Sequence, residues 1–149
     1  MIISIASDHG GFSQKQPISE HLEAIGHEVI DRGPDDGSSV DYPDFAEIVA
    51  RDVSEGRADI GILICGTGIG MAIAANKVKG VRAANLTRPE FAELARQHND
   101  ANVITLSGRF ATPEENEAIV DAFLSAEFEG GRHARRVGKM MDLEQERSL

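Results

Sequence analysis

The sequence predicts an α/β fold: a five-stranded, mostly parallel sheet with helices on both faces and a further helix at the C-terminus. Short apolar runs rich in β-branched residues alternate with longer segments in which apolar residues recur every three or four positions. The 149 residues contain neither an internal repeat nor a long linker, so we expect one domain spanning residues 1–149.

The first elements follow from apolar runs and their breakers. Ile2–Ser7 is an apolar run that predicts a buried strand, and a turn with two glycines follows it. The next segment is helical, with Leu22 and Ile25 on its apolar face, and Gly26 is expected to end it. Residues 27–31 then predict a short second strand.

The central elements include the clearest strand of the chain. Residues 44–55 predict a helix, whose apolar side consists of Phe45, Ile48, Val49 and Val53. Ile60–Cys65 is aliphatic apart from Gly61, as in strands buried on both faces. A helix of small residues is expected at 69–76, and a fourth strand at 81–84.

The last third of the chain continues the alternation. Residues 89–98 predict a helix with Phe91, Leu94 and Ala95 facing inward, and residues 103–106 predict the fifth strand. Thr112 begins the next helix as its cap, with Pro at the first position and Glu at the third. A charged helix from Arg132 to about residue 147 is expected to close the chain.

Composition excludes several classes of function. The net charge is −10 and only 5% of residues are aromatic, so a nucleic-acid partner is not expected. No apolar run is long enough to cross a membrane, and the N-terminus lacks the pattern of a signal peptide. A single cysteine fits a reducing compartment, and we therefore expect a cytoplasmic protein without membrane association.

Three groups of polar residues follow predicted strands. Asp8 and His9 come after the first strand, Cys65 and its glycines end the third, and Arg109 comes just after the fifth. Ligands of parallel α/β sheets bind beyond the carboxyl ends of the strands. We therefore expect the chemistry at one edge of the sheet.

The motif Cys65-Gly66-Thr67-Gly68-Ile69-Gly70 joins a strand to a helix. Its glycines allow successive N–H groups to face an anion, and the helix start should stabilise a thiolate at Cys65. A thiolate base beside such donors is what enolisation needs. The alternative is a plain core cysteine before a tight turn. A dinucleotide site is disfavoured, because the spacing is G-x-G-x-G and the motif follows the third strand.

Other candidates each have a structural alternative. His98 and Asn99 end a helix, where His98 either protonates a sugar ring oxygen or only interacts with the helix dipole. Asp8 and His9 either bind a sugar phosphate or shape a turn. Tyr42, the only tyrosine, either reaches the substrate or anchors a loop.

The final helix begins with a basic cluster. Arg132 and Arg136 are four residues apart and share a face, with His133 between them. Guanidinium groups favour bidentate contacts to phosphate oxygens, so this pair can hold one phosphate. The alternative is a solvated helix whose cations pair with nearby glutamates. Arg109 is either a further phosphate contact or part of a surface ion pair.

Together these segments resemble the ribose-5-phosphate isomerase B family, which includes the galactose-6-phosphate isomerase subunits. The family-like stretches lie in the expected order at residues 7–12, 41–44, 62–70, 74–77, 95–103 and 129–133. The resemblance implies a Rossmann-like three-layer sandwich and a homodimer with active sites between subunits, and it leaves open whether dimers pair into a homotetramer. It implies interconversion of ribose 5-phosphate and ribulose 5-phosphate through an enediolate, with no metal or organic cofactor.

The resemblance also assigns roles. Cys65 matches the base that moves the proton between C1 and C2, and Thr67 and His98 match residues of ring opening. Asn99 and the amides of Gly66, Gly68 and Gly70 match the enediolate cradle, and Asp8 matches a hydroxyl contact. The matched phosphate contacts are His9, Arg109, Arg132, His133 and Arg136, with the C-terminal group given by the neighbouring subunit.

Three alternatives remain at this point. The same chemistry on a tetrose 4-phosphate or hexose 6-phosphate differs only in the distance from Cys65 to the arginines. A non-catalytic sugar-phosphate sensor would bind without proton exchange. A nicotinamide-dependent oxidoreductase would bind nucleotide, against which the glycine spacing argues.

Overall fold

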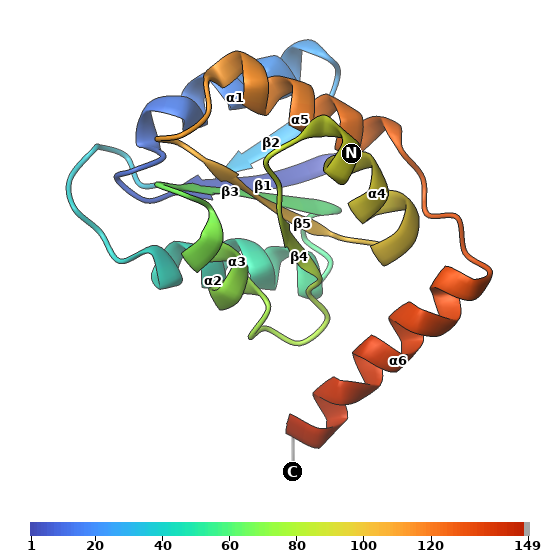
Figure 1. The fold of residues 1–149 in the computed structure, drawn as a ribbon. Coiled ribbons are helices and arrows are strands. Elements are labelled where there is room, and N and C mark those ends of the chain that lie inside the picture. The colour runs from blue at the N-terminus through green and yellow to red at the C-terminus, as the bar shows by residue number, and fades with distance from the viewer. Residues whose placement is uncertain (148–149) are drawn as a thin grey trace.

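The computed structural model describes residues 1–147 and contains one five-stranded sheet in that range (Figure 1). The strands lie in the order β2-β1-β3-β5-β4, and every neighbouring pair is parallel. Their bounds are β1 Ile2–Ser7, β2 Glu28–Asp31, β3 Ile60–Cys65, β4 Ala83–Asn85 and β5 Val103–Ser107. The predicted α/β class is confirmed.

Helices cover both faces of this sheet. They are α1 Phe12–Ala24, α2 Tyr42–Ser54, α3 Ile69–Ala75, α4 Pro89–Asn99, α5 Pro113–Ser125 and α6 Arg132–Arg147. Figure 1 shows α1, α4 and α5 on one face, α2 and α3 on the other, and α6 projecting away from the body. The prediction of a separate C-terminal helix is confirmed.

Strand side chains alternate between two cores. Ile62 and Ile64 of β3 pack on the α1, α4 and α5 side with Phe123, whereas Leu63 and Cys65 pack on the α2 and α3 side with Met71. Because successive strand residues point to opposite faces, the thiol of Cys65 is directed toward α2 and α3.

Some predicted helix faces are wrong. Phe91 and Leu94 are 50% and 41% exposed, whereas Ala95 is buried as predicted and shares the inner side of α4 with Ala92. Positions 91 and 94 have the same three-residue spacing as 92 and 95, so periodicity alone cannot choose between the two stripes. Ile25 and Ile48 are also exposed, at 48% and 40%. Ile25 follows the last residue of α1, outside the helical face.

The predicted start of α5 is confirmed in detail. The Glu115 amide donates to Thr112 Oγ1 at 3.1 Å, and the Thr112 amide donates to Glu115 Oε1 at 3.2 Å. Thr112 and Glu115 thus form a reciprocal capping box before the first turn.

A buried carboxylate ties β1, α2 and the following loops together. Asp52, 1% exposed, accepts hydrogen bonds from Ser4 Oγ at 2.7 Å, Arg32 Nε at 2.7 Å and Arg57 Nε at 2.8 Å. Burial raises the pKa of Asp52, but these hydrogen bonds outweigh it and lower the pKa to about 2. Asp52 is therefore an ionised anchor on the α2 side of the sheet.

Among residues 1–147, no helix combines the length and apolar character needed to cross a lipid bilayer.

Candidate functional site

The candidate site is centred where the chain order reverses, between β1 and β3. From β1 the chain continues to β2 on one side, and β3 lies on the other. The Asp8 amide donates to the Ile64 carbonyl at 3.1 Å, which holds the turn after β1 against the end of β3. Switch points of this kind are where parallel α/β sheets bind ligands.

Cys65 ends β3 and is 5% exposed. The Gly68 amide donates a hydrogen bond to its Sγ at 3.1 Å. Gly68 has a φ of 82°, in the left-handed region that glycine adopts without steric cost. The turn therefore aims a backbone donor directly at the sulfur.

The carbonyl of Gly68 is held in place by a side chain of β5. Thr105 Oγ1, on β5, donates to it at 2.7 Å and lies 3.2 Å from Asn85 Oδ1. Thr105 is fully buried. The position of the Gly68 turn is thus set by a side chain that does not reach the surface.

The loop after β5 closes over the same turn. The Arg109 amide donates to the Gly66 carbonyl at 3.1 Å, and Ser107 Oγ donates to that carbonyl at 2.8 Å. A Cβ placed on Gly66 would lie 3.3 Å from Arg109 Nη1, so the guanidinium rests directly on the glycine. Within the described residues Arg109 has no ion-pair partner, which leaves its charge available for an anion.

Two further predicted residues, Tyr42 and His9, lie at this edge. Tyr42, 41% exposed, packs on Gly70, where a Cβ would lie 2.7 Å from its ring. His9 Nδ1 accepts a hydrogen bond from the Val40 amide at 3.3 Å and thereby holds the loop before α2. The predicted edge of the sheet therefore includes Tyr42 and His9.

Asp8 and Thr67 have structural partners in the same turns. Asp8 Oδ1 accepts from the amides of Gly10 and Gly11 at 2.7 and 3.1 Å, as the turn-forming alternative requires. Thr67 Oγ1 accepts from the Ile69 amide at 3.1 Å at the start of α3. These contacts fix the two turns, and the turn of Asp8 packs against Gly66, since a Cβ on Gly10 would lie 2.9 Å from the Gly66 nitrogen.

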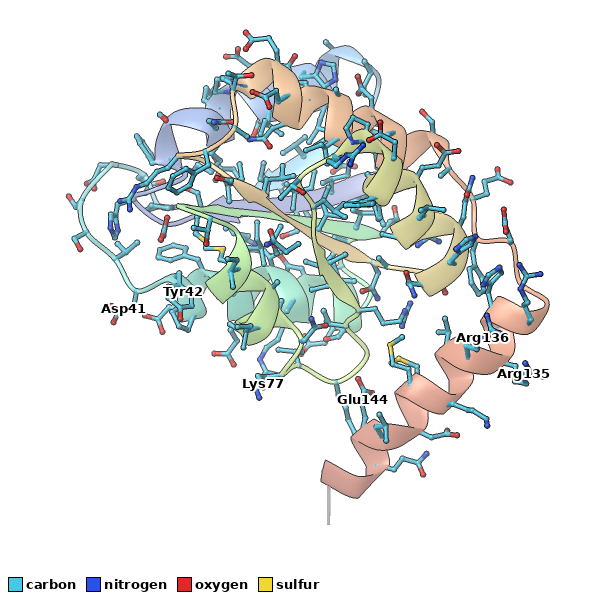
Figure 2. The ribbon with its side chains drawn as sticks, in the orientation of Figure 1. Asp41, Tyr42, Lys77, Arg135, Arg136 and Glu144 are labelled. Atoms are coloured by element: carbon cyan, nitrogen blue, oxygen red, sulfur yellow. The ribbon has the colours of Figure 1, made fainter. Side chains whose placement is uncertain are left out.

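The remaining candidates form a second group at the opposite edge. His98 and Asn99 end α4, just before β5 begins, and Arg132, His133 and Arg136 lie on α6. Figure 2 shows Tyr42 and Arg136 on opposite sides of the molecule. The five residues of β5 separate the two edges by about 15 Å at the usual rise per residue.

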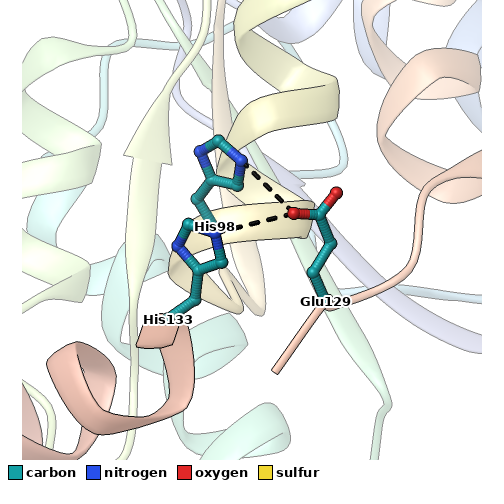
Figure 3. Close-up of side chains that lie close together, drawn as sticks. All are labelled: His98, Glu129 and His133. Carbon is teal, nitrogen blue, oxygen red and sulfur yellow. Dashed lines mark ion pairs between the residues drawn. The ribbon is translucent and has the colours of Figure 1, made fainter. Parts of the chain in front are cut away.

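Within the second group, two imidazoles stack on each other. The rings of His98 and His133 are 4.1 Å apart and nearly parallel, at 7° (Figure 3). Glu129 Oε1 lies 3.5 Å from Nε2 of each histidine. Burial, together with the charge of His98 and Arg132, lowers the pKa of His133 below its usual 6.5, although Glu129 opposes this.

Sequence reasoning missed Glu129 and Thr105. Glu129 is brought to α4 by its own amide, which donates to the Gln97 carbonyl at 3.0 Å. Its spacing of four residues from His133 was the available signal. Thr105, which lies among Val103, Ile104 and Leu106, was the corresponding signal for a buried hydroxyl with a partner.

Comparison with known proteins gives one consistent result. Residues 3–140 match the family model described as ribose/galactose isomerase. The probable ribose-5-phosphate isomerase B of Mycoplasma pneumoniae is 51% identical over 97% of this chain and 96% of its own length.

Solved structures of similar proteins indicate the same family. Clostridium thermocellum ribose-5-phosphate isomerase B has a TM-score of 0.97 at 51% identity, covering 98% of this chain and 99% of its own. The Mycoplasma genitalium enzyme, solved with bound ribulose-5-phosphate, has a TM-score of 0.94 at 54% identity, covering 97% of each chain. With the sequence matched over nearly its whole length and the fold superimposed, the chain belongs to the ribose/galactose isomerase family.

Proposed function

We propose that this protein is an aldose–ketose isomerase that interconverts ribose 5-phosphate and ribulose 5-phosphate through an enediolate. The observation that carries the proposal is the sulfur of Cys65 at the switch point of the sheet, 3.1 Å from the Gly68 amide. A close relative is a ribose-5-phosphate isomerase B that holds ribulose-5-phosphate, which supports the choice of a pentose.

In this proposal Cys65 is the general base. Its thiolate takes a proton from C2 of the open-chain aldose and returns it to C1. The amides of Gly66 and Gly70, with Asn99, stabilise the negative oxygen that forms on the way. The Gly68 amide, already bonded to sulfur, stabilises the thiolate before the proton moves.

Ring opening and binding use the other candidates. Thr67 and His98 move the proton that opens the sugar ring, and Asp8 and Tyr42 contact its hydroxyl groups. The phosphate is held by cations, of which three are arginines without an ion-pair partner among the described residues: Arg109, Arg132 and Arg136. His9 and His133 complete this set.

We propose that a second copy of the chain completes each site in a homodimer, with a homotetramer as a further step. The two groups lie at opposite edges of one chain, too far apart for a single sugar phosphate. Exposed apolar residues support a partner: Ile69 and Ile73 on α3 are 53% and 59% exposed, and Leu143 on α6 is 54% exposed. Since the proposed base is a reduced cysteine, we place the enzyme in the cytoplasm.

The direct test is an isomerase assay on ribose 5-phosphate without added metal or nucleotide, run in deuterium oxide. Deuterium entering the sugar and formation of ribulose 5-phosphate are the expected results. Four- and six-carbon sugar phosphates provide the comparison. A hundredfold preference for another chain length would overturn the pentose, and binding without deuterium exchange would overturn the enzyme.

A further inference from the structure

His98, Glu129 and His133 bring three metal-binding atoms to one point. Glu129 Oε1 lies 3.5 Å from His98 Nε2 and 3.5 Å from His133 Nε2, and all three ligand atoms lie within 4.8 Å of one another. Figure 3 shows a nitrogen of each ring facing the same carboxylate oxygen. The residues come from the end of α4, the loop between α5 and α6, and the start of α6.

A buried ring nitrogen of His133 is a second, independent observation that points to a ligand. Its side chain is 7% exposed, and its Nε2 is fully buried without a hydrogen-bond partner among the described residues. Buried polar atoms are normally paired, because leaving one unpaired costs free energy. The stacked rings hold this nitrogen toward the carboxylate, so the missing partner belongs between the three side chains.

The spacing is close to that of a tetrahedral zinc site. Zinc bonds of about 2.0–2.2 Å to nitrogen and oxygen place neighbouring ligand atoms roughly 3.3 Å apart. Both distances to Glu129 Oε1 are 3.5 Å. A metal ion lies in the plane of each imidazole that binds it, so the two near-parallel rings must unstack around the ion. Rotation of His98, whose side chain is 38% exposed, achieves this and also shortens the distance between the two nitrogens.

We propose that Zn²⁺, or a similar late first-row divalent ion, binds to His98, Glu129 and His133 and inhibits the protein. Two imidazoles and one carboxylate favour such ions over Mg²⁺ or Ca²⁺, which prefer oxygen ligands. A fourth position remains for water. The inhibitory part rests on the proposed function, because it removes His98 from ring opening.

The surroundings limit how tightly the ion is held. Arg132 and Arg136 lie on the same helix as His133, and their positive charge repels a dication. The ion is therefore a reversible inhibitor and not a permanent structural metal. Glu129 has no part in the proposed isomerisation, which makes it the residue to change.

The test uses chelator-treated protein, zinc chloride and two variants. Glu129→Gln removes the carboxylate ligand, and Glu127→Gln removes an exposed carboxylate two residues away as the matched control. Calorimetry should show zinc binding to the wild type and to Glu127→Gln, with binding at least roughly tenfold weaker in Glu129→Gln. Zinc should inhibit the isomerase in the same order, and magnesium should not inhibit it.

A measurement on the unmutated protein locates the ion. The chain has five histidines, and nitrogen NMR of their imidazoles reports which of them bind zinc. Shifts confined to His98 and His133 support the proposal. Shifts only at His9, His21 or His27, no zinc binding at all, or unchanged inhibition of Glu129→Gln would each overturn it. The last result would place the inhibitory ion elsewhere, for example on Cys65.

The two proposals can fail separately. Absence of isomerase activity in the metal-free wild type would overturn the proposed function, while calorimetry and NMR would still decide the metal site. Zinc held by both histidines without loss of activity would overturn the inhibitory part and the role of His98 together.

Discussion

The amide of Gly68 lies 3.1 Å from Sγ of Cys65. Thr105, on the neighbouring strand β5, donates a hydrogen bond to the carbonyl of the same glycine. One buried hydroxyl therefore controls the placement of the donor that stabilises the proposed base. The turn and strand β5 act as one unit, although Gly68 and Thr105 lie 37 positions apart in the sequence.

Cys65→Ala should reduce kcat by roughly 10²–10⁴-fold, because it removes the general base. KM should change little, since the phosphate contacts remain. Steady-state kinetics and calorimetry with ribose 5-phosphate check both parts. A large loss of substrate binding would show that Cys65 mainly holds the substrate.

Thr105→Val keeps the shape of the side chain and removes its hydroxyl. We expect kcat to fall about tenfold, which corresponds to about 1.4 kcal/mol, with KM nearly unchanged. The free energy of unfolding should fall by about 1–3 kcal/mol, because the Gly68 carbonyl loses a buried donor. Thr105→Ser should restore kcat. A lower melting temperature with normal kcat would mean that Thr105 is only structural.

Arg136→Ala should mainly raise KM. Loss of a charge-assisted contact of about 1.5–3 kcal/mol corresponds to a rise of roughly 10–150-fold. Arg135→Ala is the control, since both side chains project from the same stretch of α6 (Figure 2). If the two variants raise KM equally, Arg136 contributes only a general electrostatic attraction to the phosphate.

Mixing two inactive variants tests the shared site. Equal amounts of Cys65→Ala and His98→Ala, refolded together, should regain about a quarter of wild-type activity. Half of the dimers then contain one chain of each variant, and each such dimer has one intact site out of two. Cys65→Ala mixed with Thr67→Ala should stay inactive, because both residues lie at the same edge. No recovery in the first mixture, with dimers present, would place each site within one chain.

Asp52→Asn should change the stability of the protein in acid. The carboxyl has a pKa of about 2 in the fold, below the unfolded value of about 3.9, so its ionisation stabilises the native state above about pH 5. That contribution, about 2 kcal/mol, is lost as the pH falls toward 2. Urea unfolding at pH 7 and pH 3 should show a smaller pH dependence in Asp52→Asn than in the wild type or in Asp35→Asn, an exposed control. An unchanged pH dependence would contradict the assignment.

The sequence predicted what depends on local pattern. The five residues before Cys65, aliphatic apart from Gly61, mark a strand buried on both faces, and Thr112 with Glu115 marks a helix start. The rule for parallel sheets then placed Cys65 and Arg109 at one edge. Phe91 was assigned to the wrong side of α4, because the choice between two adjacent stripes depends on packing against α5.

The second group could not be assembled from the sequence. Glu129 meets His98 only because the loop after α5 runs along α4 and bonds to Gln97. No local pattern encodes that contact, since it joins segments more than 30 residues apart. The division of the candidates between two edges likewise became visible only once the strand order was known.

The projecting helix α6 carries part of the proposed phosphate binding on a segment of the chain far from the proposed base. On the proposed arrangement, proton transfer by Cys65 depends on the packed sheet. Three of the phosphate contacts, Arg132, His133 and Arg136, depend instead on where α6 of the second copy lies. Changing residues 126–131 would then alter the length of sugar accepted while the reactive sulfur and its turn stay untouched. A change in this short connector can therefore alter which sugar phosphate is accepted without changing the stability of the core.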